Sequence, residues 1–310
     1  MEIVIQLIGK IFNRLWKMLY WPICRTYACY IVGDSPADAL LRGLFSLQFW
    51  RDHRYWPNFV HPRYFSEMVA SRMLNERDPR WTMLSDKLHV RDYVAGKVGR
   101  EYLIPLLWSG DNPEEIPFDE LPLKFVIKTN HGCGYNIIVK DKTQLDRTQT
   151  RRQLKKWLGE NFCHAKCLGT AWAYKNIKPK IMIEAFLNDN GKTPLDYKFF
   201  CFSGRAEFLL MTFDRYGDLS EKHFDRDFNP LDLWNGSEQY TGEIARPDNY
   251  EEMVHFAETL AQGMDFIRVD IYNVDSRIYF GELTCYPAGS LARFIPREYD
   301  YIFGKKWKWK

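Results

Sequence analysis

Hydrophobic residues recur at helical spacing through the first third of the chain. In residues 3–32, apolar side chains form one stripe and basic side chains form another. The apolar stripe contains Ile3, Leu7, Ile11, Leu15 and Leu19, and the basic one contains Lys10, Arg14 and Lys17. The basic residues interrupt any run of the roughly 20 apolar residues that a membrane-spanning helix needs. The pattern predicts an amphipathic helix that either lies in a membrane interface, anchored by Trp16, Tyr20 and Trp21, or packs on the body of the protein.

The rest of the chain combines helices with short strands. Residues 35–100 have helical spacing, with loops at Pro57 and Pro62 and with Ser85 or Asp86 as the cap of the last helix. Strands are expected at 102–108, 125–128, 136–140, 181–187, 197–202, 206–213, 267–272 and 278–283, and further helices at about 146–175 and 250–262. Strands and helices do not alternate regularly, so the sequence predicts an α+β protein.

Composition narrows the class of protein. Hydrophobic residues make up 46% and charged residues 27% of the 310 residues, as is ordinary for a folded soluble protein. The length allows one large domain or two to three lobes. Aromatic residues make up 16% of the chain and suffice to fill a large core, so no long disordered stretch is expected.

Basic residues gather at the two ends, although the formal net charge is only +3. Residues 1–32 hold four basic residues against one acidic residue, and residues 304–310 hold four lysines and two tryptophans. Such ends fit an anionic membrane surface, whereas nucleic-acid binding usually uses a whole basic face. We therefore expect peripheral membrane contact through residues 1–32 and 304–310, and no nucleic-acid partner.

Cysteine usage indicates a reducing compartment. The seven cysteines are an odd number, and no secretory leader precedes them. Cys163-His164-x-x-Cys167 has the spacing of half a metal site, but no second pair follows it. Burial of small thiols in a helix explains these residues better, and a cytoplasmic protein is expected.

The first segment with candidate chemistry runs from Phe125 to Val139. It predicts a strand, a glycine loop and a second strand, with Lys128 near the end of the first strand. A lysine in an apolar strand is costly to bury without an anionic partner, and Gly132 and Gly134 allow backbone N–H groups to wrap phosphate oxygens. The segment matches neither a Walker loop nor a Rossmann turn. It predicts a phosphate-binding flap, and a plain hairpin with an exposed lysine is the alternative.

The second segment is a predicted hairpin over residues 266–284. Side chains alternate along a strand, so Arg268 and Asp270 share one face, and Glu282 and Thr284 share a face of the partner strand. Two carboxylates on adjacent strands suit Mg²⁺ bound together with phosphates, and Arg268 beside them suits a transferring phosphate. A cross-strand salt bridge between Arg268 and Glu282 is the alternative.

These motifs resemble the ATP-grasp superfamily and, within it, the TupA-like branch associated with teichuronopeptide and other surface-polysaccharide assembly. The resemblance runs from about Ser85 to Phe303, and more loosely from Phe65 to Asp86. It implies an α+β ATP-grasp fold, in which two lobes clasp ATP behind a mostly helical N-terminal region. The expected divisions are an amphipathic segment at 1–32, a helical region at 33–120, a glycine-flap lobe at 121–187 and a metal-binding lobe with a basic tail at 188–310.

The resemblance also implies which residues bind ATP. The expected nucleotide contacts are Lys87, Lys128, His131, Gly132, Gly134, Glu184, Ala185, Leu187, Asp196 and Lys198. Among them, Glu184 would take the adenine amino group and Asp196 the ribose. Lys128 and Arg268 are the expected catalytic residues. The expected metal ligands are Asp270, Glu282 and Thr284, the last of which replaces the family's usual Asn.

The implied reaction is ATP-dependent ligation of a carboxylate to an amine through an acylphosphate, with two Mg²⁺ ions. Arg215, His223 and Arg226 are candidates to hold the acceptor carboxylate. By resemblance, the acceptor is a uronic acid of a capsule or O-antigen precursor, either small or lipid-linked, and the donor is an amino acid or amine. The expected location is the cytoplasm, at the inner face of the cell membrane.

Other classes of protein stay open. Asp225-Arg-Asp227 is a D-x-D sequence of the kind that some glycosyltransferases use to bind a metal and a nucleotide sugar. No nucleotide-sugar-binding α/β domain precedes it, and D-x-D is frequent by chance. A phosphotransferase that stops after the first step and a non-catalytic nucleotide-binding relative are further alternatives.

Overall fold

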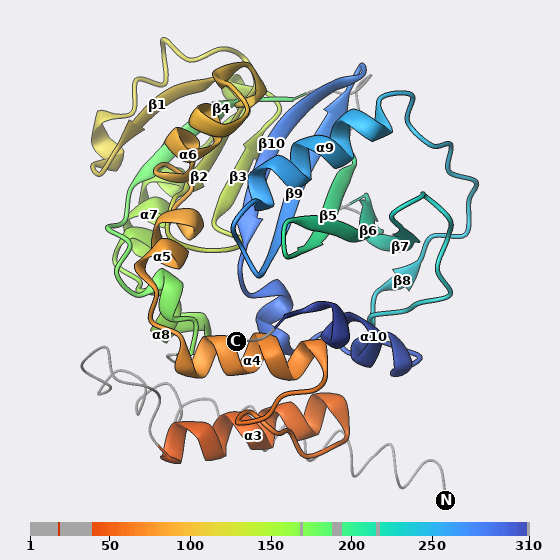
Figure 1. Cartoon of the computed structure of the whole chain (residues 1–310). Helices are drawn as coiled ribbons and strands as arrows, with labels where there is room; N and C mark the ends of the chain where they lie inside the picture. The colour runs from red at the N-terminus through yellow and green to blue at the C-terminus, as the bar shows by residue number, and fades with distance from the viewer. Residues whose placement is uncertain (1–17, 19–38, 168–169, 188–193, 215–217, 309–310) are drawn as a thin grey trace, which may run out of the picture.

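The protein is described by a computed structural model over residues 18, 39–167, 170–187, 194–214 and 218–308. Two β-sheets stand side by side above a layer of helices (Figure 1). The predicted α+β class is therefore confirmed. Apart from Met18, the amphipathic segment expected at 3–32 lies outside the described residues, and so does Arg215.

The helices before the first strand confirm the helical prediction from residue 39 onward, and residues 35–38 lie outside the described part of the chain. In the described chain they are α3 (Ala39–His53), α4 (Phe65–Asn75), α5 (Pro79–Ser85) and α6 (Val90–Lys97). Asp86 ends α5 and begins the turn that leads to α6. Its Oδ1 accepts from Leu88 N at 2.9 Å, and its carbonyl accepts from Val90 N at 2.9 Å. Helix α4 is buried along nearly its whole length, so it belongs to the core of the molecule. No helix in the described part of the chain is both long and apolar enough to span a bilayer.

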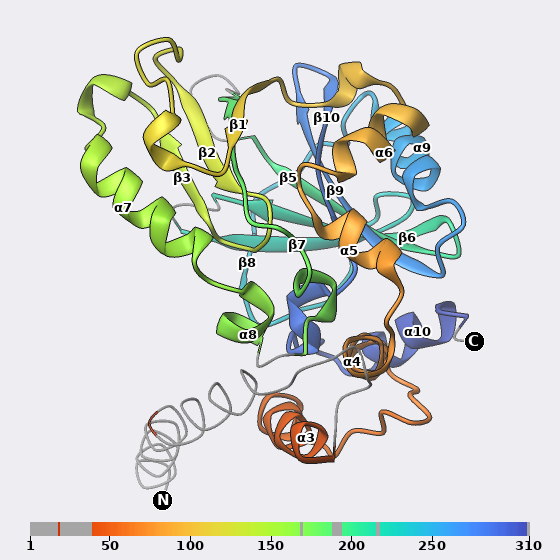
Figure 2. The same cartoon turned by 90° about the vertical axis from the view of Figure 1, so that its left-hand side faces the viewer.

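The first sheet is antiparallel and has the order β1-β4-β2-β3. Its strands are β1 (Leu106–Gly110), β2 (Phe125–Thr129), β3 (Asn136–Val139) and β4 (Ile181–Ala185). Phe125 and Ile127 point into a core that helix α7 (Arg147–Leu158) covers, and Figure 2 shows α7 along the outer side of this sheet. Strand β1 pairs with β4, so the sheet begins at Leu106 and not at the expected boundary near 121.

The helix expected at about 146–175 is interrupted. Helix α7 ends at Leu158 with Gly159 as its cap, and α8 (Phe162–Cys167) and a 3₁₀ turn follow. Cys163 is buried and free, as the sequence predicted. The 3₁₀ turns of the described chain are Arg100–Tyr102, Pro113–Glu115, Lys142–Gln144, Trp172–Tyr174 and Pro287–Ser290.

The second sheet has the order β10-β9-β5-β6-β7-β8, with only the β7–β8 pair parallel. Its strands are β5 (Asp196–Phe202), β6 (Arg205–Phe213), β7 (Ser220–Asp225), β8 (Glu238–Gln239), β9 (Phe266–Val274) and β10 (Arg277–Thr284). Helix α9 (Tyr250–Ala261) packs on one face (Figure 1). Helices α4 and α10 (Glu298–Lys306) pack on the other face, where Phe65 contacts Phe200 and Phe303 stacks on Phe208. We call this second face the site face.

The register of the second sheet aligns side chains in rows across the site face. One row, which we call the transverse row, consists of Glu282, Asp270, Lys198, Leu210 and His223. Glu282 joins it because β10 has a bulge between Phe280 and Glu282, which shifts the alternation of side chains by one residue. Gly281 stands in that bulge. A Cβ at this position would lie 2.8 Å from the carbonyl oxygen of Asp270, so only glycine fits the close approach.

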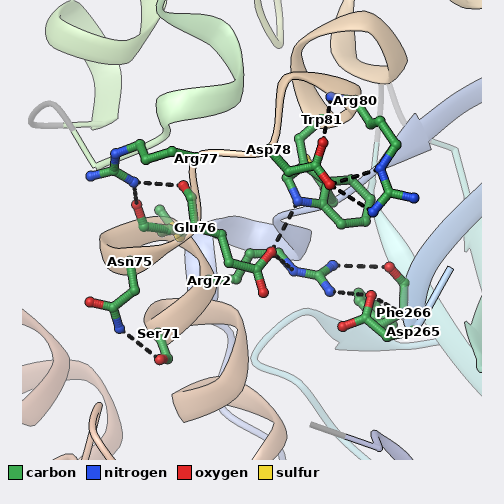
Figure 3. A network of polar contacts seen from close by, with 12 residues as sticks. Ser71, Arg72, Asn75, Glu76, Arg77, Asp78, Arg80, Trp81, Asp265 and Phe266 are labelled. Atoms are coloured by element: carbon green, nitrogen blue, oxygen red, sulfur yellow. Dashed lines mark hydrogen bonds and ion pairs between the residues drawn. The ribbon is translucent and has the colours of Figure 1, made fainter. Parts of the chain in front are cut away.

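A buried arginine joins α4 to the start of β9 (Figure 3). Arg72 is fully buried and donates to the carbonyl of Phe266 at 2.9 Å and to Asp265 at 2.6 Å. Its guanidinium lies 4.4 Å from the ring centroids of both Trp81 and Trp307. The contacts satisfy a charge that would otherwise be costly to bury, and they fix the strand that carries Arg268 and Asp270.

Candidate functional site

A group of three charged side chains marks the first sheet's contribution to the site. Lys128 of β2 donates to Glu184 of β4 at 2.7 Å, and Arg91 of α6 donates to the other oxygen of that carboxylate at 2.9 Å. Glu184 is 5% exposed. The lysine therefore has the anionic partner that its position in an apolar strand demanded. Arg91 was missed from the sequence, because a lone arginine in a helix carries no signal of its own.

The glycine loop closes against the turn between α5 and α6. The side chain of Lys87 donates to the carbonyl of Gly132, and its backbone N–H donates to Asn130 O at 3.1 Å. Gly134 has a φ of 76°, which favours glycine. The ring of His131, which was expected to contact the nucleotide, is buried and lies 3.0 Å from Trp157 O. It does not line the cleft between the two sheets.

The second sheet contributes an arginine that two carboxylates surround. Arg268 donates to both oxygens of Asp270 at 2.6 Å, and its Nη2 also donates to Glu282 at 3.0 Å and to Thr284 at 3.1 Å. The salt bridge that the sequence left open as an alternative is formed, and it lies within the predicted cluster. Burial raises the pKa of Asp270 to about 6. The positive charge of Arg268 opposes this rise, and the negative charge of Glu282 adds to it.

Strand β5 adds Lys198, which lies between Asp270 and Leu210 in the transverse row. Lys198 is 7% exposed, lies 3.1 Å from Asp196 and donates to Thr212 Oγ1 at 2.7 Å. Asp196 lines the cleft between the two sheets. Lys198 does not line that cleft and instead faces the cavities beyond it.

One cleft brings most of the predicted residues together. Its lining contains Lys87, Lys128, Gly132, Gly134, Glu184, Asp196, Asp270 and Glu282. Residues that the sequence did not single out also contribute, namely Arg91, Cys133, Tyr135, Asn136, Met182, Tyr272, Phe280 and Gly281. Two cavities of about 410 and 520 Å³ adjoin the cleft residues and share Lys198 and Arg268. The larger is chiefly apolar and includes Phe45 of α3, so the N-terminal helices help to wall the site.

Several predicted contacts fall outside the cleft. Ala185 and Leu187 do not line it, and the N–H of Ala185 already donates to Pro105 O at 2.9 Å. Arg226 was expected at the acceptor. It pairs with Glu258 of α9, on the face of the sheet opposite the site, and does not line the cleft. His223, by contrast, is buried on the site face.

The residues predicted to bind a metal could hold a magnesium ion together with phosphate oxygens. Asp270 and Glu282 are paired across two strands, and the Thr284 hydroxyl donates to Glu282 at 2.8 Å. Within the described residues no group of three or more His, Cys, Asp or Glu side chains is placed to bind a metal. Mg²⁺ is often bound by one or two carboxylates plus substrate phosphates. Two carboxylates and a hydroxyl therefore suit Mg²⁺ better than they suit a metal ion that is bound by protein side chains alone.

Two sheets that face one cleft, with cations beside the first and an Arg-x-Asp with a cross-strand Glu on the second, define an ATP-grasp protein. Residues 67–308 match the family model described as TupA-like ATPgrasp, and the chain belongs to that family.

Solved structures with the ATP-grasp fold are more distant. A D-alanine–D-alanine ligase from Bacillus anthracis complexed with ATP is 14% identical, with 66% of this chain and 54% of that chain covered and a TM-score of 0.37. The ATP-grasp ligase PsnB with a phosphomimetic precursor variant, Mg and ADP is 14% identical, with coverages of 67% and 52% and a TM-score of 0.38. An ADP complex of N5-carboxyaminoimidazole ribonucleotide synthetase is 12% identical, with coverages of 67% and 46% and a TM-score of 0.42. The chain thus spans about half the length of these structures, and no curated protein matches it.

Proposed function

We propose that the chain is an ATP-dependent carboxylate–amine ligase that forms an amide through an acylphosphate. The observation that carries the proposal is the transverse row, in which Glu282, Asp270 and Lys198 adjoin Arg268 on the face turned to the cleft. Lys128 of the first sheet lines the same cleft. Cations and hard oxygen ligands therefore border the cleft and the two cavities that adjoin it, which is the arrangement that phosphoryl transfer needs.

The residues divide the chemistry between the two sheets. Lys87 and Lys128 offset charge on the nucleotide phosphates, and Arg268 stabilises the phosphoryl group as a carboxylate oxygen bonds to phosphorus and ADP leaves. Bound Mg²⁺ supplies further neutralisation of phosphate oxygens. An amine then attacks the acyl carbon, phosphate departs, and the surplus amine proton passes to solvent. The glycine loop at Gly132–Gly134 excludes water that would hydrolyse the acylphosphate.

Nucleotide entry is expected to widen the cleft between the two sheets. The cleft between them measures about 70 Å³, whereas small-molecule sites usually measure roughly 300–1,000 Å³. Lys87 and Gly132 are joined across it. We therefore propose that ATP binding breaks this contact and that closure over ATP restores the exclusion of water.

We further propose that the acceptor is a uronic acid of a cell-surface polysaccharide precursor and that the amine is an amino acid or a simple amine. Membership of the TupA-like family supports this class of acceptor. Membrane contact through residues 1–32 stays a proposal as well. Unchanged membrane partition after deletion of these residues would contradict it.

The glycosyltransferase alternative receives no support from the geometry of its D-x-D sequence. Asp225 accepts from the backbone N–H groups of Asp227 and Asn229 at 2.9 and 2.8 Å, and from the Asn229 side chain at 2.9 Å. Its carboxylate therefore closes a turn. Asp227 is exposed beside it.

The test is ATP consumption by the full chain with Mg²⁺, a hexuronic acid and hydroxylamine as the amine. We expect ADP release to require both the acid and Mg²⁺, and a hydroxamate to accumulate. Asp270→Asn and Glu282→Gln should each lower the rate at least tenfold, because each removes a charged metal ligand. Asp227→Asn is the matched control and should retain the wild-type rate. Turnover of a UDP-sugar without ATP, lost in Asp227→Asn, would instead establish the glycosyltransferase.

A further inference from the structure

The smaller of the two adjoining cavities, about 410 Å³, extends along the site face away from the cleft. We call it the polar cavity. The face of β5, β6 and β7 forms its floor, and α4 and the segment after β10 form its roof. Lys198 and Arg268 line it as well. Its volume falls in the range of small-molecule sites, roughly 300–1,000 Å³.

His223 stands at the far end of the transverse row that begins at the metal ligands. Lys198 and His223 are separated by the single strand β6, and Asp270 lies one strand beyond Lys198. Neighbouring strands are about 4.8 Å apart, which puts His223 roughly 10 Å from Lys198 and roughly 14 Å from Asp270 along the row. A ligand that reaches both Lys198 and His223 therefore needs a body of several bonds beyond its carboxylate.

Two buried polar side chains of the polar cavity have no partner in the described part of the chain. Neither ring nitrogen of His223, which is 2% exposed, has a partner there within hydrogen-bonding distance and angle, although the Leu233 backbone lies near enough to raise its pKa slightly; the hydroxyl of Ser290, which is 3% exposed, has no partner either. A buried donor or acceptor left unpaired costs about 1–3 kcal/mol. Such groups are rare in native proteins, and a cavity that contains two of them is suited to a polar ligand.

The segment that carries Ser290 is held in an unusual conformation. Ala288 and Ser290 have φ values of 49° and 65°, in a region that residues other than glycine seldom adopt. His53 of α3 fixes the segment through a 2.7 Å hydrogen bond between its ring and Ser290 O. Backbone strain of this kind concentrates at binding sites, where surrounding contacts maintain it.

The chemistry of the lining distinguishes between classes of ligand. Burial lowers the pKa of His223 to about 4, against the smaller opposing effects of Glu221 and the Leu233 backbone, so its imidazole is neutral near pH 7 and offers one donor and one acceptor. Asn235 and Ser237 add groups that also donate and accept. A carboxylate only accepts hydrogen bonds, whereas a hydroxyl does both. A hydroxyl group can therefore pair with either ring nitrogen of His223, whereas a carboxylate can pair only with the nitrogen that carries the proton.

We infer that the polar cavity binds the polyhydroxylated body of the acceptor, with hydroxyl groups at His223 and Ser290 and the reacting carboxylate at Lys198 and Arg268. The inference rests on the proposed ligase function for the role of the carboxylate. It adds the class of group that is recognised and the residues that recognise it.

The test compares three acids of equal charge on the full chain with Mg²⁺ and AMP-PNP. D-glucuronate and D-galacturonate carry hydroxyl groups, and cyclohexanecarboxylate does not. Calorimetry should show at least tenfold tighter binding of one of the two hexuronates. His223→Leu and Ser290→Ala should each remove most of that preference, while binding of cyclohexanecarboxylate and AMP-PNP stays unchanged. The melting temperature of His223→Leu should not fall, because the change removes an unpaired buried polar group.

The outcomes separate this inference from the proposed function. ATP consumption with an acid and an amine, but without any preference for hexuronates, would leave the ligase standing and overturn the hydroxyl-binding cavity. A preference that both variants keep would overturn the cavity as well. A preference that both variants lose, in a protein that makes no hydroxamate, would support the cavity and contradict the ligase. Failure of every hexuronate to bind overturns the inference.

Discussion

At the scale of single residues, the carboxylate of Glu184 makes two ion pairs that the sequence did not predict. The family resemblance assigned it to the adenine amino group. In the structure its two oxygens accept from Arg91 and Lys128, and it is buried between them. Glu184 therefore holds Lys128 in position, and the proposed contact with the base would be additional to this role.

The first prediction tests this role. Glu184→Gln should raise the KM for ATP at least tenfold and lower the free energy of unfolding by about 1–3 kcal/mol, because two half-buried cations lose their shared counter-charge. Steady-state kinetics and urea unfolding provide the two measurements. The exposed pair Arg147–Asp119, at 2.7 Å, offers the control. Arg147→Gln should change stability by less than about 0.5 kcal/mol, and an equal loss in both variants would refute the role of Glu184.

Buried histidine gives the second prediction at this scale. Burial lowers the pKa of His53 to about 4, and its hydrogen bond to Ser290 O opposes that shift. The unfolded chain takes up a proton at this residue near pH 6.5, whereas the folded chain does not until about pH 4. The stability that neutral His53 contributes is therefore present above pH 6.5 and is lost as the pH falls towards 4.

His53→Gln keeps a side-chain N–H donor but cannot titrate. Urea unfolding at pH 7 and pH 5 should show that the wild type loses about 2 kcal/mol more than the variant over this interval. Equal losses in the two proteins would mean that His53 titrates alike in the folded and unfolded chains.

At the scale of elements, the bulge in β10 decides whether the metal ligands meet. Without it, the alternation of side chains would place Glu282 on the face opposite Asp270. Gly281 permits the bulge, because a Cβ there would lie 2.8 Å from Asp270 O. A single backbone feature therefore creates the paired carboxylates.

Gly281→Ala should consequently separate β10 from β9. We expect a loss of about 1–3 kcal/mol in the free energy of unfolding, as for overpacked sites, and a weaker dependence of ATP use on Mg²⁺, measured as a higher half-saturating Mg²⁺ concentration. Gly96→Ala in α6 is the matched control, since a Cβ there meets nothing within 4 Å. That change should stabilise the helix by up to about 1 kcal/mol. A Gly281→Ala variant with wild-type Mg²⁺ dependence would disprove the role of the bulge.

The sequence predicted the strands of the site better than the contacts between them. Alternation along single strands placed Arg268 with Asp270 and Glu282 with Thr284, because that pattern is local. The positions of Arg226 and Arg91 could not be predicted, for the opposite reason. Whether an arginine faces the cleft or α9 depends on which helix covers which face, and no local pattern encodes this.

At the scale of the whole molecule, segments far apart in the sequence enclose the site together. Helix α4 forms part of the roof of the polar cavity, and α3 supplies Phe45 to the apolar one. The divisions expected at 33–120 and 188–310 therefore share one core, in which Phe65 packs on Phe200. The strands of the grasp could be recognised from motifs, but the assembly of these walls depends on contacts between residues more than 100 positions apart.

The C-terminal segment closes this common core. Trp307 was expected in a basic tail suited to a membrane surface, yet its side chain is 2% exposed. Its indole N–H donates to Asp265 at 2.8 Å, and its ring lies over the buried guanidinium of Arg72 (Figure 3 shows Arg72 with Asp265). This indole is therefore not free to enter a bilayer while the core is folded.

Trp307→Ala should lower the free energy of unfolding by about 3–5 kcal/mol, because it removes a large buried ring and leaves one side of Arg72 without its contact. Trp56, which is 64% exposed, provides the matched control, and Trp56→Ala should cost less than about 0.5 kcal/mol. Urea unfolding measures both. If the two substitutions cost the same small amount, the C-terminal segment does not belong to the core. If Trp307→Ala also raises the KM for ATP, the Arg72 network supports the strand that carries Arg268 and Asp270, since Trp307 itself does not line the cleft.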